Sequence, residues 1–134
     1  MTKLTTIEGI GPAFEEKLQS AGITSCEVLL EKGSTSKGRD EIAAASGVDG
    51  GRILKFVNHA DLMRVKGVGG EYAELLEAAG VDSVPELAQR NADNLAAKME
   101  EINTAKSLVR ALPSAVSVQE WVAQAKSMEK VVTH

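Results

Sequence analysis

Apolar residues recur along this chain at the three- and four-residue spacing of amphipathic helices, and nowhere do they alternate with polar residues as in a half-buried strand. The strongest helical segments follow two short glycine-containing stretches and run through Leu18 and Leu76. Near the C-terminal end, one apolar stripe of a closing helix is formed by Trp121, Val122, Ala125 and Met128. The pattern predicts an all-α fold.

The two glycine-containing stretches share one pattern. Residues 7–12 read Ile-Glu-Gly-Ile-Gly-Pro, and residues 65–70 read Val-Lys-Gly-Val-Gly-Gly. We call them the first loop and the second loop. A helix that ends and restarts within four residues needs backbone dihedrals that glycine adopts at little cost. We therefore predict a helical hairpin at each loop, with backbone amides pointing outward at the start of the following helix, where an anion can bind.

The similarity extends well beyond the loops. Sliding the sequence against itself by 58 residues brings many identical residues into register. They include Leu4/Leu62, Gly9/Gly67, Gly11/Gly69, Glu16/Glu74, Leu18/Leu76, Gly22/Gly80, Ser25/Ser83 and Leu29/Leu87. A run in register at one offset indicates an internal repeat. We predict two tandem repeats of about 58 residues, over residues 1–58 and 59–112, and a C-terminal capping helix within residues 113–134 that packs on the second repeat.

Within each repeat, the first helix is expected to end in a left-handed glycine, Gly22 or Gly80. Capping-box spacing then predicts new helices that begin at residues 24–27 and 83–86, and a further one at 117–120.

The copies diverge after this point. In the first, residues 40–46 form an alanine-rich helix and residues 47–51 a second sharp turn. The second copy has no glycine at the matching place, and we expect a weaker turn at residues 102–103.

Composition and charge narrow the functions. The chain has 134 residues, 43% of them apolar, one cysteine, two histidines and a formal net charge of −4. These numbers favour a globular protein without an internal disulfide, a metal site or a bound cofactor. No serine, histidine and acid suggest a catalytic set, so we expect neither an enzyme nor a small-molecule substrate. With no secretory signal and no apolar run of about 18 residues, we expect a cytoplasmic protein without membrane partners.

Proteins that bind duplex DNA usually carry a basic face, which this acidic chain as a whole lacks. A local patch exists, because residues 52–66 hold four cations against Asp61 alone. The sequence therefore predicts a nucleic-acid site at the second loop, formed by Arg52, Lys55, Arg64, Lys66, Gly67, Val68, Gly69 and Gly70. A solvated helix face is the alternative reading of this patch.

The first loop is expected to be structural. Acidic residues Glu8, Glu15 and Glu16 outnumber Lys17 around it and should repel a phosphate. The structural residues of this loop are Gly9, Ile10, Gly11 and Pro12.

Four further side chains carry expectations. Phe14 and Tyr72 occupy equivalent positions after the two loops, where each either packs in the core or is exposed for stacking or a protein contact. Cys26 aligns with an apolar residue and is expected to be buried, and His59 is expected on a helix surface.

Both loops resemble the helix-hairpin-helix motif, and the chain resembles a bacterial tandem helix-hairpin-helix family of unknown function (domain-of-unknown-function family 4332), with a SAM-like fold. The resemblance is carried by residues 7–23, 53–69, 72–87 and 118–126. Helix-hairpin-helix relatives bind DNA without sequence preference or use the scaffold for protein contacts. Base-excision glycosylases of this class place a lysine where Ala13 and Glu71 stand here, so the resemblance does not imply that activity.

Two functions follow as expectations. The first is a non-enzymatic module that binds the nucleic-acid backbone weakly, without sequence preference, through the second loop. The alternative is a protein–protein interaction adaptor in which both hairpins are structural and nucleic acid is not bound.

Overall fold

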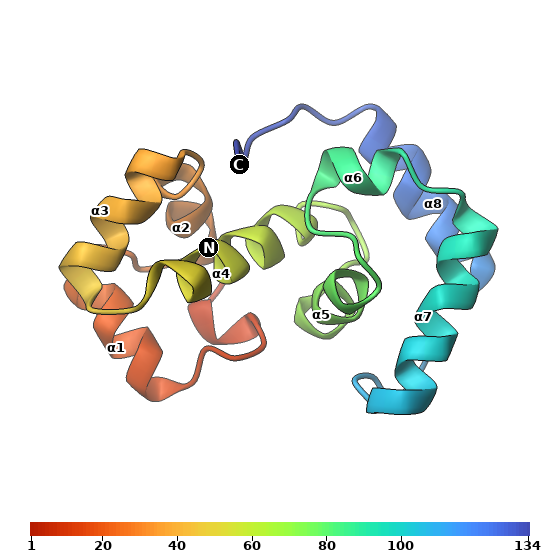
Figure 1. Cartoon of the computed structure of the whole chain (residues 1–134), viewed down its shortest axis with the longest axis horizontal. Helices are drawn as coiled ribbons and strands as arrows, with labels where there is room; N and C mark the ends of the chain where they lie inside the picture. The colour runs from red at the N-terminus through yellow and green to blue at the C-terminus, as the bar shows by residue number, and fades with distance from the viewer. The chain divides into compact units, whose positions relative to one another are not determined.

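The computed structural model describes all 134 residues and contains eight α-helices, one short 3-10 helix (η1) and no β-strand (Figure 1). The all-α prediction is confirmed. The elements are η1 (Leu4–Thr6), α1 (Pro12–Ser20), α2 (Cys26–Lys32), α3 (Ser36–Ser46), α4 (Gly50–Leu62), α5 (Gly70–Ala78), α6 (Val84–Ala88), α7 (Ala92–Lys106) and α8 (Ala115–Lys126). None of them combines the length and the apolar composition that a bilayer-spanning helix needs.

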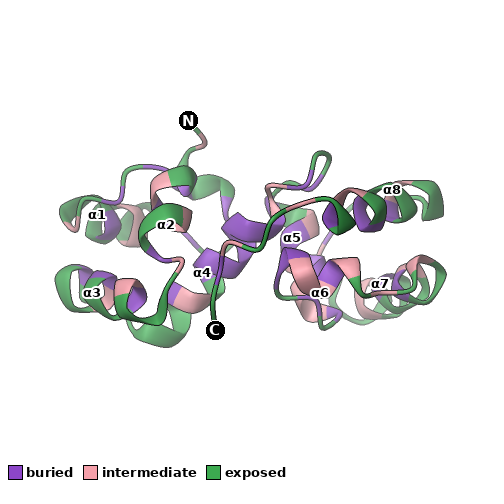
Figure 2. Cartoon of the chain, turned by 90° about the horizontal axis from the view of Figure 1, so that it is seen from above, coloured by how far each residue is buried: buried purple, intermediate pink, exposed green.

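The chain divides into two compact units. Unit 1 comprises Met1–Asp61 together with Val131–His134, and unit 2 comprises Leu62–Lys130. In Figure 2 the exposed residues lie on the outer faces of α1, α3, α7 and α8, and the buried residues lie on the faces turned toward the interior of each unit. Each unit therefore has its own core.

Two pairs of glycines that lie 58 residues apart have matching backbone conformations. The first glycine of each loop has a left-handed backbone, with φ of 93° at Gly9 and 96° at Gly67. The glycines that end α1 and α5 are also left-handed, as predicted, with φ of 82° at Gly22 and 96° at Gly80. These paired conformations are compatible with the predicted tandem repeat.

The hydrogen bonds of the two loops also correspond. Within each loop, the amide of the central apolar residue donates to the carbonyl three residues earlier, at 3.2 Å for Ile10 and 3.0 Å for Val68. The second glycine of each loop caps the next helix, and its carbonyl accepts a bond of 2.9 Å from the amide four residues later. The sequence pattern thus produces the same sharp turn in both units.

The fourth helices α4 and α8 also correspond, at an offset of 65 residues rather than 58. Their buried apolar residues align as Ile53/Val118, Phe56/Trp121, Val57/Val122 and Ala60/Ala125. Each presents an aromatic ring to the helix after its own loop, with centroid distances of 5.8 Å for Phe14–Phe56 and 5.3 Å for Tyr72–Trp121. In unit 2, α8 packs against α6 and α7.

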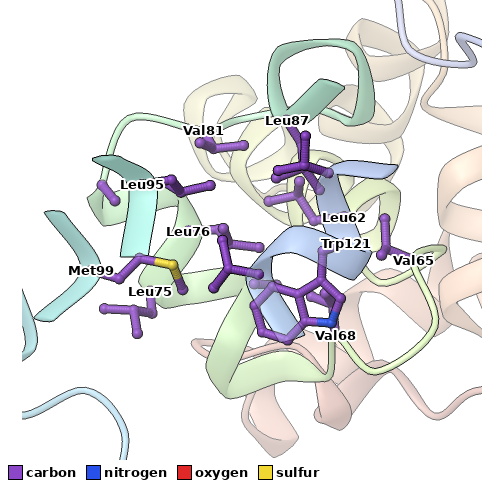
Figure 3. Close-up of a cluster of buried hydrophobic side chains, with 14 of the residues drawn as sticks. Leu62, Val65, Val68, Leu75, Leu76, Val81, Leu87, Leu95, Met99 and Trp121 are labelled. Atoms are coloured by element: carbon purple, nitrogen blue, oxygen red, sulfur yellow. The ribbon is translucent and has the colours of Figure 1, made fainter. Parts of the chain in front are cut away.

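The core of unit 2 is largely aliphatic (Figure 3). Leu62, Leu76 and Leu87 are fully buried in it. Trp121, from α8, places its indole beside Val68, the residue between the two glycines of the second loop (Figure 3). The loop therefore packs on the core through its own valine and against an indole of the last helix.

Two helix starts differ from the prediction. The cap of α2 is Ser25, whose hydroxyl accepts a hydrogen bond from the amide of Val28, and not Thr24. The cap of α8 is Ser114, so this helix begins before the predicted start at Ser117. At α2 the two candidate hydroxyl residues are adjacent, and at α8 they are three residues apart; in both places the cap is the one with an extended backbone whose hydroxyl accepts from the amide three residues later.

Three other expectations concern the starts of α3 and α6 and the turn predicted within α7. α3 begins at Ser36, earlier than predicted, because Thr35 caps it. The predicted turn at residues 102–103 is wrong, because α7 runs without a break through that position, where no glycine or proline interrupts it. The predicted cap of α6 is confirmed, since the hydroxyl of Ser83 accepts a hydrogen bond from the Glu86 amide.

The single cysteine is buried as expected. Burial of the Cys26 thiol, together with the nearby charge of Glu27, raises its pKa from 9.0 to about 11. The expectation for His59 is wrong, because this residue is fully buried.

Candidate interface at the second loop

A side chain of α8 holds the backbone at the start of the second loop. The amide of Lys66 donates a hydrogen bond of 3.0 Å to Gln124 Oε1, and Gln124 Nε2 donates one of 3.1 Å to the carbonyl of Lys66. A carboxamide has both a donor and an acceptor, so it can satisfy both polar groups of one residue at once. We call this pair of bonds the Gln124 clamp.

Trp121 covers the next residue of the loop. A Cβ placed on Gly67 would lie 3.0 Å from Trp121 Nε1, closer than carbon atoms normally approach. Two separate features favour glycine at position 67: its φ is positive, and an indole occupies the space where a Cβ would lie. Val68 points inward and is buried. The first half of the loop is thus bonded to Gln124 and packs against Trp121 and the core of unit 2.

The second half of the loop is open. A Cβ placed on Gly69 would meet no atom within 4 Å. Gly69 caps α5 without a side-chain hydrogen bond, and Gly70 begins the helix and is buried. Glu71 lies in the first turn, where its negative charge already interacts favourably with the helix dipole. An anion that approached these amides would meet this carboxylate.

The four predicted cations lie in different units. Arg52 and Lys55 belong to unit 1, and Arg64 and Lys66 belong to unit 2. Arg64 Nη2 donates to the carbonyl of Glu129 at 2.8 Å, while the side chain of Lys66 is exposed. Within unit 2 the second loop therefore has two of the four predicted cations beside it in sequence.

Arg52 lies near the helix that follows the first loop. Its guanidinium carbon is 5.3 Å from the centre of the Phe14 ring, and its Nη1 forms an ion pair of 3.0 Å with Asp49 Oδ1. The hydrogen bond from the Arg52 amide, reinforced by the guanidinium charge, lowers the pKa of Asp49. This cation is thus already paired with a neighbouring carboxylate.

The first loop shows the same conformation without an equivalent of the Gln124 clamp among its hydrogen bonds. Ile10 is buried, and Gly9 lies against Phe56, whose Cε1 would be 3.5 Å from an added Cβ. A Cβ on Gly11 would meet nothing within 4 Å, and Pro12, which has no amide hydrogen, begins α1.

The two aromatic residues after the loops are neither fully packed in the core nor fully exposed, the two alternatives that the sequence left open. Phe14 and Tyr72 are both half-buried. The Tyr72 ring packs beside Trp121, and its hydroxyl donates to the carbonyl of Ala111 at 2.9 Å. Each ring packs the helix that follows a loop against the fourth helix of the same unit.

A pocket of about 400 Å³ opens beside the second loop. Its lining residues are Lys66, Gly67, Tyr72, Pro113, Ser117, Glu120, Trp121 and Gln124. Leu112 and Val116 flank two of these residues in sequence and are two of the three large apolar residues exposed on the chain. Sequence reasoning missed Gln124, Leu112 and Val116, although the position of Gln124 one helical turn after Trp121 places both on one face of α8.

The chain belongs to the family described as Domain of unknown function (DUF4332), whose model matches residues 8–128. The match therefore covers all eight helices, the second loop, and the first loop except Ile7. No curated protein and no solved structure matches the chain significantly.

Proposed function

We propose that this chain is a non-enzymatic module that binds another protein, with both helix-hairpin-helix loops serving as structural hairpins. The observation that carries this proposal is the Gln124 clamp, because the donor and the acceptor of Lys66 already have an internal partner. A hairpin of this kind binds nucleic acid through hydrogen bonds from the peptide nitrogens of its glycine loop to phosphate oxygens. Here Gln124 uses the peptide nitrogen of Lys66 at the start of the loop, and an anion that approached the amides at the start of α5 would meet the Glu71 carboxylate.

Charge supports the same choice. Unit 1 contains seven basic and nine acidic side chains, and unit 2 contains eight and ten, so each has a formal charge of −2. Binding to a polyanion depends on cations that replace its counterions, and neither unit has a cationic excess. A protein partner makes no such demand.

The exposed apolar residues of unit 2 give the proposal a surface to test. Leu112 and Val116 are 42% and 61% exposed; Leu112 lies in the connection before α8 and Val116 in the first turn of α8, next to the pocket-lining residues Pro113 and Ser117. Exposed aliphatic side chains beside a concave surface are typical of protein contacts.

The test is co-purification from nuclease-treated lysate, with wild type compared with Val116→Glu and with Ala123→Glu. Ala123 is exposed on the same helix, so the control adds the same charge away from the turn. We expect a partner that survives nuclease treatment, is lost with Val116→Glu and is retained with Ala123→Glu.

A second arm measures binding to duplex and single-stranded DNA at about 50 and 200 mM salt, a range over which a few phosphate contacts weaken steeply. We expect no binding at either concentration. DNA binding at the lower salt that is lost with Lys66→Glu would overturn the proposal and favour the nucleic-acid function, for which the open Gly69 leaves room.

A further inference from the structure

The indole of Trp121 is a hydrogen-bond donor without an acceptor in this chain. Trp121 is 4% exposed, and its Nε1 lies on the ring edge that faces the second loop (Figure 3). No acceptor of the chain bonds this atom, yet the atom is not sealed from solvent. The N–H of a buried tryptophan normally has a partner. Since Trp121 lines the pocket beside the second loop, an acceptor from outside the chain can reach the indole through that pocket.

The neutral polar groups that line the pocket differ in what they leave free. The Tyr72 hydroxyl donates to the carbonyl of Ala111, and the carboxamide of Gln124 is occupied by the clamp. Ser117 Oγ accepts a bond of 3.0 Å from the Ser114 hydroxyl and keeps its own hydrogen for a further acceptor. The pocket therefore presents two unused donors to a ligand, this hydroxyl and the indole.

The charges of the pocket cancel, and rings supply much of its remaining surface. Lys66 and Glu120 are both exposed, and neither forms an ion pair. Because one cation and one anion line the pocket, a charged ligand would be attracted by one and repelled by the other. Tyr72, Trp121 and Pro113 contribute the rings. The pocket thus suits a neutral hydrogen-bond acceptor attached to an apolar group.

We propose that this pocket binds an extended, proline-containing segment of a partner protein, with a peptide carbonyl on Trp121 Nε1 and a proline ring against Tyr72. A peptide carbonyl is a neutral acceptor, and in the polyproline II conformation it has no internal hydrogen bond. Proline-rich segments already populate this conformation, so they lose little entropy when they dock on aromatic surfaces. The inference rests on the proposed protein-binding function and names the chemistry of the partner segment.

The test uses the full chain and two fluorescent peptides. One is a short repeat of Pro-Pro-Leu-Pro-Ala, and the other is its counterpart with alanine in place of every proline. Anisotropy measures binding up to millimolar peptide. Trp121 is the only tryptophan, so its indole N–H gives a single proton–nitrogen NMR signal that reports directly on the proposed bond. We expect the proline peptide to bind about tenfold or more tightly than its counterpart and to shift this signal.

A matched replacement isolates the donor. Benzothienylalanine has the shape of tryptophan with sulfur in place of the N–H, and it can be incorporated at position 121 alone because the chain has no other tryptophan. It should weaken binding of the proline peptide about two- to tenfold, the contribution of one neutral hydrogen bond. Ser117→Phe, which fills the pocket, should abolish binding, whereas Ala123→Phe, on the same helix but not lining the pocket, should preserve it.

Equal affinity for the two peptides, no binding at millimolar concentration, or an indole signal that does not shift on binding would overturn the inference. The comparison of peptides on the wild-type chain does not depend on the folding of any variant. Failure here, together with a nuclease-resistant partner that is lost with Val116→Glu, would remove the proline-binding pocket and leave the proposed function standing. Loss of both would remove both.

Discussion

The Gln124 clamp predicts a measurable contribution to the stability of unit 2. The change to Gln124→Ala removes two neutral hydrogen bonds, of 3.0 and 3.1 Å, and leaves Trp121 in place. A neutral hydrogen bond contributes a net ~0.5–1.5 kcal/mol, and groups left without a partner in a buried place cost more. Since water can reach the exposed Lys66 peptide after the change, the lower half of the range applies. We expect a loss of about 1 to 2 kcal/mol.

Trp121 makes this loss easy to measure. It is the only tryptophan of the chain and lies in the core of unit 2, so its fluorescence during urea denaturation reports the unfolding of that unit. With a denaturant dependence of about 1 kcal/mol per molar urea, typical of a small domain, the midpoint should fall by about 1 to 2 M.

The matched control is Gln119→Ala. Gln119 is exposed on the same helix and makes no side-chain hydrogen bond, so the control has the same change of helix propensity without loss of the clamp. If the two variants unfold within about 0.5 kcal/mol of each other, the clamp contributes nothing beyond a surface contact. The main support for a structural second loop would then be gone.

Three further outcomes test other parts of the structure. Gly67→Ala should destabilise unit 2 by about 1–3 kcal/mol, because it combines a positive φ with a contact on Trp121, whereas Gly69→Ala should cost under about 1 kcal/mol in the same fluorescence assay. Burial raises the pKa of Cys26 to about 11. At about pH 8 its thiol should therefore react with a disulfide reagent only as fast as local unfolding of unit 1 exposes it. A reaction rate equal to that of free cysteine would contradict this. The Thr2 amide lowers the pKa of Glu27 through a hydrogen bond. The stability that this carboxylate adds should therefore be present above the ordinary pKa of 4.5 and be lost as the pH falls through the lowered pKa. If the free energy of unfolding of Glu27→Gln follows the same pH dependence as that of the wild type over this range, the prediction is wrong.

The helices and their turning points could be predicted from the sequence because they depend on local chemistry. A left-handed backbone at Gly22 or Gly80 follows from a glycine at the end of an apolar repeat, and the 58-residue offset places both. The errors are also local in origin. Thr24 and Ser25 are both able to cap a helix, and spacing alone does not decide between adjacent hydroxyls.

The contacts that bear on function could not be predicted in the same way. Gln124 meets Lys66 across 58 residues of sequence, and Tyr72 meets Ala111 across 39. Each contact depends on where a whole helix or a connecting segment packs in its unit, and no local pattern encodes that position. The role of a glutamine on a helix surface can be inferred only when the packing position of that helix is known.

The correspondence between α4 and α8 explains why the two loops differ despite their shared glycine pattern. At the offset of 65 residues, Trp121 aligns with Phe56 and Gln124 aligns with His59. Both units therefore place an aromatic ring against the helix after the loop, but only the second places a carboxamide one turn later. The glycines determine how the chain turns, and the fourth helix determines which peptide groups of the turn remain available. The peptide groups that are free in such a hairpin thus depend on a helix that lies far along the sequence, as Gln124 does from Lys66, so glycine spacing alone is insufficient to assign binding to either loop.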